Sequence, residues 1–169
     1  MIRRVLVITL VLVIAAVLQT SVFPSLTFLG FSPDLLLLAA VALAMRDGPM
    51  SGARVGAVAG LLTDLLVVQA PVGLGMLVFT IVGYGVGFAR PYLASDSITA
   101  PLLLTFVSGG LATGAYGLAS YVFVDQSSDT AMLVRASIAV ALYNTLLAPV
   151  AITLMRRLSN RFPLQAAAE

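Results

Sequence analysis

The chain contains no cysteine, histidine or tryptophan among its 169 residues, and every one of its basic residues is arginine because lysine is also absent. Without cysteine and histidine, the usual zinc, haem, iron–sulfur and thiol sites are excluded, as is any disulfide. Charge is scarce as well, since 9% of the residues are charged, against roughly 25% in an ordinary soluble domain. A surface that faces water cannot be built from so few charges.

What the chain does have is apolar residues, at 60% of the total and with a mean hydropathy of +1.09. This content excludes a disordered chain, because disordered sequences are poor in apolar residues. The arginines are scattered among the apolar runs and form no basic face, so nucleic acid is not an expected partner. We therefore predict an all-α integral membrane protein of one domain, embedded in the lipid bilayer, with no cofactor and no metal.

Six apolar runs, separated by short polar or helix-breaking segments, predict six membrane-spanning helices. A spanning helix needs roughly 17–25 mostly apolar residues. The second run is too short to cross a hydrocarbon core of about 30 Å. We expect it to thin the bilayer, to borrow flanking residues or to be partly buried among other helices. The predicted spans are residues 5–23, 34–46, 51–68, 73–89, 100–124 and 130–155.

The arginines also predict the orientation of these spans. With the N-terminus in the cytoplasm, eight of the nine arginines lie on the inner side and Arg135 alone lies towards the outside. This asymmetry follows the positive-inside rule, and six spans place both termini in the cytoplasm. A cleaved signal peptide is the alternative interpretation of the first run, but no A-x-A-like cleavage site follows it.

Small residues recur at four-residue spacing along several of the predicted helices. Such stripes let two helix backbones approach closely in a membrane. They indicate packing inside one bundle or, alternatively, a face that meets a partner membrane protein. The stripes are Gly52, Gly56 and Gly60 in the third span, Gly83 and Gly87 in the fourth, and Gly110 and Gly114 in the fifth.

Three polar residues within the predicted spans are candidate site residues. Asp64 continues the glycine stripe of the third span, and a carboxylate at this depth is costly and rarely faces lipid. It could pair with a cation, receive a polar group of a partner, or carry protons or ions. Arg135 lies at a matching depth in the sixth span, so we predict an ion pair or a water-bridged pair; the alternative for Arg135 is snorkelling to the interface. Asn144 is expected to form hydrogen bonds between helices.

No catalytic constellation accompanies these residues. The chain has neither a histidine base nor a cysteine nucleophile, it lacks paired carboxylates at a convincing depth, and it contains no phosphate-binding G-x-x-x-x-G-K-[ST] loop. A transporter or channel usually shows more polar groups at the midplane. We therefore expect a protein that is not an enzyme and that acts by assembly within the membrane.

Several motifs, in their order along the chain, resemble the bacterial rod shape-determining protein family MreD. They are Leu18-Gln19-Thr20-Ser21, Ser32-Pro33-Asp34-Leu35-Leu36-Leu37-Leu38, Ala44-Met45-Arg46-Asp47-Gly48-Pro49, Gly60-Leu61-Leu62-Thr63-Asp64 and Pro71-Val72-Gly73-Leu74-Gly75. The most specific are the Pro-Asp-Leu-Leu-Leu segment and the Gly-Leu-Leu-x-Asp segment with the Gly-x-Gly that follows.

The resemblance implies a six-span inner-membrane scaffold of the cell-elongation machinery with no enzymatic activity. It implies association with the single-span protein MreC, and with the RodA polymerase, its penicillin-binding transpeptidase and MreB. It also implies a fold similar to the vitamin-binding S component of energy-coupling-factor transporters, and an S component is the main alternative function. On the scaffold hypothesis, a glycine stripe such as Gly52, Gly56 and Gly60 would contact the single span of MreC.

Overall fold

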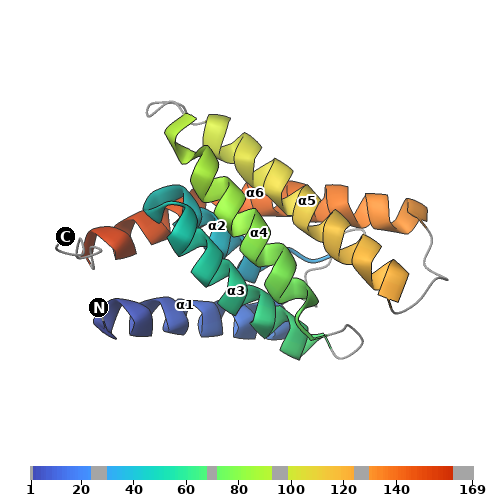
Figure 1. Cartoon of the computed structure of the whole chain (residues 1–169), viewed down its shortest axis with the longest axis horizontal. Helices are drawn as coiled ribbons and strands as arrows, with labels where there is room; N and C mark the ends of the chain where they lie inside the picture. The colour runs from blue at the N-terminus through green and yellow to red at the C-terminus, as the bar shows by residue number, and fades with distance from the viewer. Residues whose placement is uncertain (1, 24–29, 68–71, 93–98, 124–129, 162–169) are drawn as a thin grey trace.

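The computed structural model describes residues 2–23, 30–67, 72–92, 99–123 and 130–161. Within these ranges the chain is helical, as predicted (Figure 1). The elements are α1 (Ile2–Ser21), α2 (Leu35–Asp47), α3 (Pro49–Leu66), α4 (Leu74–Ala89), a short 3₁₀ helix (Arg90–Tyr92), α5 (Thr99–Phe123) and α6 (Thr130–Arg161).

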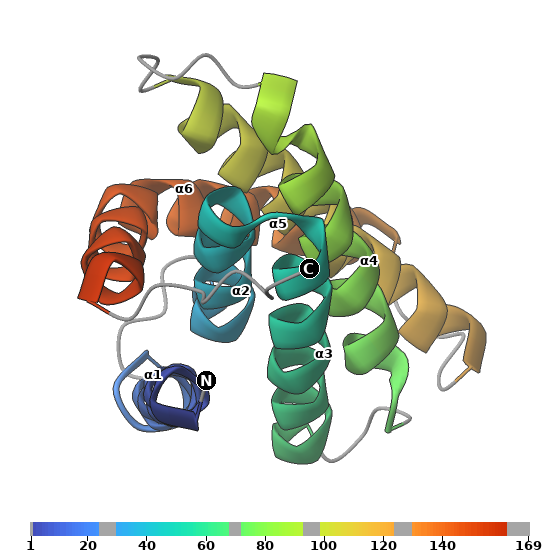
Figure 2. The same cartoon turned by 60° about the vertical axis from the view of Figure 1, so that its left-hand side comes forward.

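The helices form two antiparallel hairpins arranged around α2. Helix α3 packs along α4, and α5 packs along α6. Helix α2 contacts both hairpins and also α1 (Figure 2). The beginning of α1 and the end of α6 lie on the same side of the molecule (Figure 1).

Helix α2 forms the centre of the core. With 13 residues it is about 20 Å long at 1.5 Å per residue, which is shorter than a hydrocarbon core of about 30 Å. Every residue from Leu36 to Ala44 is buried. Of the three arrangements that the sequence left open for this run, the structure shows burial among the other helices.

The helix ends differ most clearly from the predicted apolar runs at the end of α6. Helix α6 continues to Arg161, whereas the predicted span ends at residue 155. Arginine is a good helix former, and positive charge in the last turn interacts favourably with the helix dipole. Arg156 and Arg157 therefore favour continuation of this helix beyond its apolar part, and Arg161 places a positive charge in its last turn. The C-terminal part of α6, which contains Pro149, runs in a different direction from its beginning (Figure 2), as expected for proline inside a helix.

Four of the described helices are long and apolar enough to cross a membrane by themselves. They cover Arg3–Ser21, Leu74–Tyr92, Thr99–Phe123 and Thr130–Arg161. Helix α2 is too short for this criterion and α3 is less apolar, because it carries Arg54 and Asp64 among its small residues.

Candidate functional site

The glycine stripe of α3 is buried against α4. A methyl group added at Gly52, Gly56 or Gly60 would overlap the main-chain carbonyl of Gly83, Phe79 or Gly75, respectively. Gly83 in turn lies against the carbonyl of Gly52, and Gly87 lies against the turn formed by Gly48 and Pro49. The two backbones are therefore in direct contact along the hairpin.

This arrangement corrects the hypothesis that the stripe is a docking face for a partner. Gly52, Gly56 and Gly60 are all buried inside the chain, so they are not available to a helix of another protein. Of the two interpretations of the stripe, packing within one bundle is the one that the structure supports.

Asp64 ends the stripe and holds the beginning of α4. Its Oδ1 accepts a hydrogen bond from the amide of Gly75 at 2.8 Å, and its Oδ2 accepts from Gly73 at 2.9 Å and from Met76 at 3.1 Å. Gly73 has a φ of +107°, a conformation that glycine adopts without strain. The side chain of Asp64 thus supplies the acceptors that the first amides of α4 lack, and its negative charge lies at the positive end of the helix dipole.

The predicted pair between Asp64 and Arg135 is wrong. Asp64 is 2% exposed with both oxygens bound to main-chain amides, whereas Arg135 is exposed on α6. Both residues belong to the described part of the chain, and no ion pair joins them. Amides at a helix N-terminus replace the guanidinium that the sequence suggested as the partner of this carboxylate.

The α5–α6 hairpin is packed less tightly. A methyl group at Gly110 would lie 3.7 Å from the Cβ of Ala141, which is an ordinary contact distance. At Gly114 it would lie 3.3 Å from the Oγ of Ser137, which is a tighter fit against one side chain. The atoms nearest to these two positions are side-chain atoms of α6, and the nearest backbone atom, the carbonyl oxygen of Ser137, lies 3.9 Å from the methyl position at Gly110.

Three polar side chains meet at the start of α2. Asp34 is its N-cap and accepts from the amide of Leu37 at 2.9 Å, as aspartate commonly does at this position. Asn144, which is 1% exposed, accepts from the amide of Asp34 at 3.0 Å. This contact joins α6 to α2 and confirms the predicted role of Asn144 between helices.

Gln19 is the functional residue in this cluster that sequence reasoning missed. Its Oε1 accepts from the amides of Leu35 and Leu36 at 2.9 and 3.3 Å. The residue lies in the last turns of α1 and thereby joins α1 to the start of α2. A lone amide side chain in an apolar run was the available signal, since it needs a hydrogen-bond partner in lipid.

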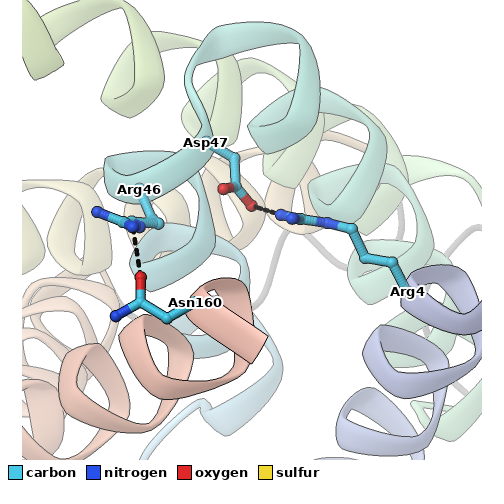
Figure 3. Close-up of polar contacts among 4 residues, drawn as sticks. All are labelled: Arg4, Arg46, Asp47 and Asn160. Carbon is cyan, nitrogen blue, oxygen red and sulfur yellow. Dashed lines mark hydrogen bonds and ion pairs between the residues drawn. The ribbon is translucent and has the colours of Figure 1, made fainter. Parts of the chain in front are cut away.

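At the opposite end of α2, charged residues join three helices (Figure 3). Arg4 of α1 forms an ion pair with Asp47, and Arg46 donates to Oδ1 of Asn160 in α6 at 2.6 Å. We call this end of the molecule the arginine end. It contains the beginning of α1, the turn between α2 and α3, and the end of α6.

Comparison with protein-family models matches residues 1–158 to the rod shape-determining protein MreD. This chain belongs to the MreD family. It is therefore a membrane protein of the system that determines cell shape, and its family is a structural one that is not known for enzymatic activity. Neither a curated protein nor a solved structure matches the chain.

The two segments that carry most of the MreD resemblance both have a structural role. Asp34 of the Pro-Asp-Leu-Leu-Leu segment caps α2, and the leucines that follow are buried. In the Gly-Leu-Leu-x-Asp segment, Gly60 contacts α4 and Asp64 binds its first amides, including that of Gly75. These MreD motifs hold the bundle together.

The described surface of this MreD-family bundle includes two hollows of functional interest. The first, which we call the α1–α6 groove, has a volume of about 410 Å³ and lies between α1 and α6 over α2. The described residues that line it are all apolar: Val11, Ile14, Ala15, Leu18, Phe23, Leu35, Leu38, Ala39, Leu147, Val150, Ala151, Leu154, Met155 and Leu158. The second, which we call the outer cavity, has a volume of about 200 Å³ and contains the side chains of Gln19, Asp34 and Tyr116.

Proposed function

We propose that this chain is a six-span, non-enzymatic scaffold of the cell-elongation complex that binds the single transmembrane helix of MreC in the α1–α6 groove. Membership of the MreD family supports the partner, because this family belongs to the rod-shape system. The proposal includes a place beside the RodA polymerase, its penicillin-binding transpeptidase and MreB.

We choose this surface because most glycines of the other helices already contact a neighbouring helix of the same chain. The glycines of α3 are already in contact with α4, and those of α5 face α6. The α1–α6 groove, in contrast, is open, and the small residue Ala151 of α6 is partly exposed in its wall. Small residues permit the close helix approach on which association in a membrane depends.

We also propose that all six helices cross the membrane and that both termini are cytoplasmic. The charges of the arginine end support this topology, since arginine-rich ends stay in the cytoplasm. Helices α2 and α3 would cross inside the bundle, where α2 is shielded from lipid by its neighbours. The similarity of the fold to an S component stays a prediction.

Filling the groove tests the proposed MreC site. Ala151→Phe places a ring in the groove, and Ala115→Phe is a matched control, because Ala115 is exposed on α5 and does not line the groove. We expect Ala151→Phe to reduce recovery of MreC with the purified chain by about tenfold or more. The control should recover MreC like the wild type, and both variants should elute as folded protein.

Crosslinking gives an independent reading, because the natural chain has no cysteine. Single cysteines at Val150 or Ile14, in the groove, should crosslink to a cysteine in the MreC span. A cysteine at Leu103, an exposed residue of α5, should not. Crosslinks from Leu103 together with full MreC recovery by Ala151→Phe would show that this surface is the wrong one.

A further inference from the structure

The outer cavity gathers polar side chains in a chain that has few of them. It lies at the start of α2, at the end of that helix opposite to the arginine end. Its lining combines the end of α1, the start of α2, the end of α3 and the middle of α5. The polar residues in it are Gln19, Ser32, Asp34, Thr63, Thr113 and Tyr116. A polar hollow of this kind in a membrane protein marks a functional site by default.

Some of these polar side chains form hydrogen bonds within the bundle. Oε1 of Gln19 binds two amides of α2, Oδ1 of Asp34 accepts from Leu37, and Thr63 donates to the carbonyl of Ala59 at 3.1 Å. The hydroxyl of Tyr116, however, is buried and has no hydrogen-bond partner among the residues that the structure describes. A buried hydroxyl without a partner is unfavourable, so a ligand that supplies a partner is favoured there.

The charge of the cavity selects the kind of ligand. Among the described residues that line the cavity, Asp34 alone has a formal charge. All nine arginines lie in the described ranges, and none of them pairs with Asp34. A carboxylate in a partly desolvated site attracts a cation and repels an anion.

The remaining walls favour an organic cation. The aromatic residues Phe79 and Tyr116 both line the cavity, and aromatic faces bind ammonium groups through cation–π interactions. The volume of about 200 Å³ equals that of about seven water molecules at ~30 Å³ each. The cavity therefore has room for a small head group but not for a large ring system.

We propose that the outer cavity binds a small organic ammonium group, with Asp34 as its counter-ion and the Tyr116 hydroxyl as a hydrogen-bond acceptor for its N–H. The same chemistry is presented by a free primary amine and by the ethanolamine head group of a phospholipid. This binding site is independent of the MreC surface, because no residue that carries the ammonium interaction lies in the α1–α6 groove.

The first test uses the full chain in phosphatidylglycerol nanodiscs, which contain no amine. Ethanolammonium is the probe, ethylene glycol is its neutral counterpart, and binding is measured by saturation-transfer NMR. We expect ethanolammonium to bind in the millimolar range and ethylene glycol not to compete with it. Asp34→Asn keeps a good N-cap and removes the charge, so it should weaken binding about tenfold.

Tyr116→Phe, which removes only the hydroxyl, should weaken binding about threefold. Tyr84→Phe is the matched control, since Tyr84 is exposed on α4 and does not line the cavity; it should bind like the wild type. If Asp34→Asn does not fold, the comparison of the two tyrosine variants still decides the outcome. Equal binding of ethylene glycol, or equal affinity in Tyr116→Phe and the wild type, would overturn the proposal.

The second arm identifies the source of the ammonium group. The chain is reconstituted with equal amounts of phosphatidylethanolamine and phosphatidylglycerol, extracted, and analysed by native mass spectrometry. Selective retention of phosphatidylethanolamine that is lost in Asp34→Asn assigns the site to the lipid head group. Binding of free ethanolammonium without selective lipid retention assigns it to a soluble amine, and binding in neither arm refutes an ammonium site.

Discussion

The two hairpins of the bundle use the same small-residue motif in different ways. Along α3 and α4, the glycines bring one backbone against the other, with no room for a single methyl group at Gly52, Gly56 or Gly60. Along α5 and α6, Gly110 has an ordinary distance to the nearest side chain. Glycine spacing alone therefore predicts that two helices pack, but not how closely they must pack.

The two hairpins also differ in the partner of their buried polar residue. Asp64 binds the first amides of its own hairpin partner, α4, whereas Asn144 of α6 reaches outside its hairpin to the start of α2. The buried polar residue of the α3–α4 hairpin thus binds within that hairpin, whereas the buried polar residue of α5–α6 attaches that hairpin to α2. The following substitutions test this contrast, from the largest expected effect to the smallest.

Gly56→Leu should be the most damaging substitution. The new side chain would collide with the main chain of Phe79, and overpacking against a backbone that cannot move costs about 3 kcal/mol or more. The folded fraction is measured by equilibrium unfolding in mixed micelles. Gly85→Leu is the matched control, because nothing lies within 4 Å of a methyl group at Gly85. Similar stabilities for the two variants would contradict direct backbone contact in this hairpin.

Asp64→Ala should be the next most damaging change. It removes a charged acceptor from three amides, and the expected loss of unfolding free energy is about 2–4 kcal/mol. Asp64→Asn should lose less, because one oxygen remains. Arg135→Gln, measured under the same conditions, should change stability by no more than about 0.5 kcal/mol. If Arg135→Gln lost as much unfolding free energy as Asp64→Ala, the result would support the predicted ion pair between Asp64 and Arg135.

Asn144→Ala should have a moderate effect. It removes the acceptor for the amide of Asp34, and hydrogen bonds between membrane helices are worth about 0.6–2 kcal/mol. Hydrogen exchange should increase at the start of α2 and stay unchanged at the start of α4. Faster exchange at the start of α4 instead would show that the two polar attachments are not separate.

Gly110→Ala should be neutral or should stabilise the protein by about 0.5 kcal/mol, because alanine loses less backbone entropy than glycine in a helix. Gly114→Ala, with its 3.3 Å contact to the Oγ of Ser137, is expected to be slightly less favourable. Both are compared with the wild type by thermal unfolding. A loss above about 2 kcal/mol at Gly110 would mean that the second hairpin is packed as tightly as the first.

The helices themselves could be predicted from the sequence because lipid imposes a strong rule. Each spanning segment must be long, apolar and helical to satisfy its own backbone, and the proline and glycine between the runs mark the ends. The end of α6 was the exception, since Arg156 and Arg157 break the apolar pattern but not the helix. Hydropathy reports what lipid accepts, whereas helix propensity decides where the helix ends.

The partners of the polar residues were harder to predict. Asn144 was expected to join helices, and it does. For Asp64, the expected partner was a charged side chain, but its actual partners are three main-chain amides. The amino-acid sequence does not show which main-chain amides at the start of a helix lack an acceptor. The only signal was the Gly73-Leu74-Gly75 segment, whose small residues let the start of α4 approach the carboxylate.

The shortness of α2 also has a consequence for biogenesis. A helix of about 20 Å that is buried along most of its length gains little from contact with lipid on both sides, and a stand-alone span needs about 20 residues. It therefore has to leave the translocon together with α3, on which it packs more extensively than on α1. On the proposed six-span topology, insertion and tertiary folding are one event for the central helix, so a ribosome stalled before α3 emerges should leave α2 outside the bilayer.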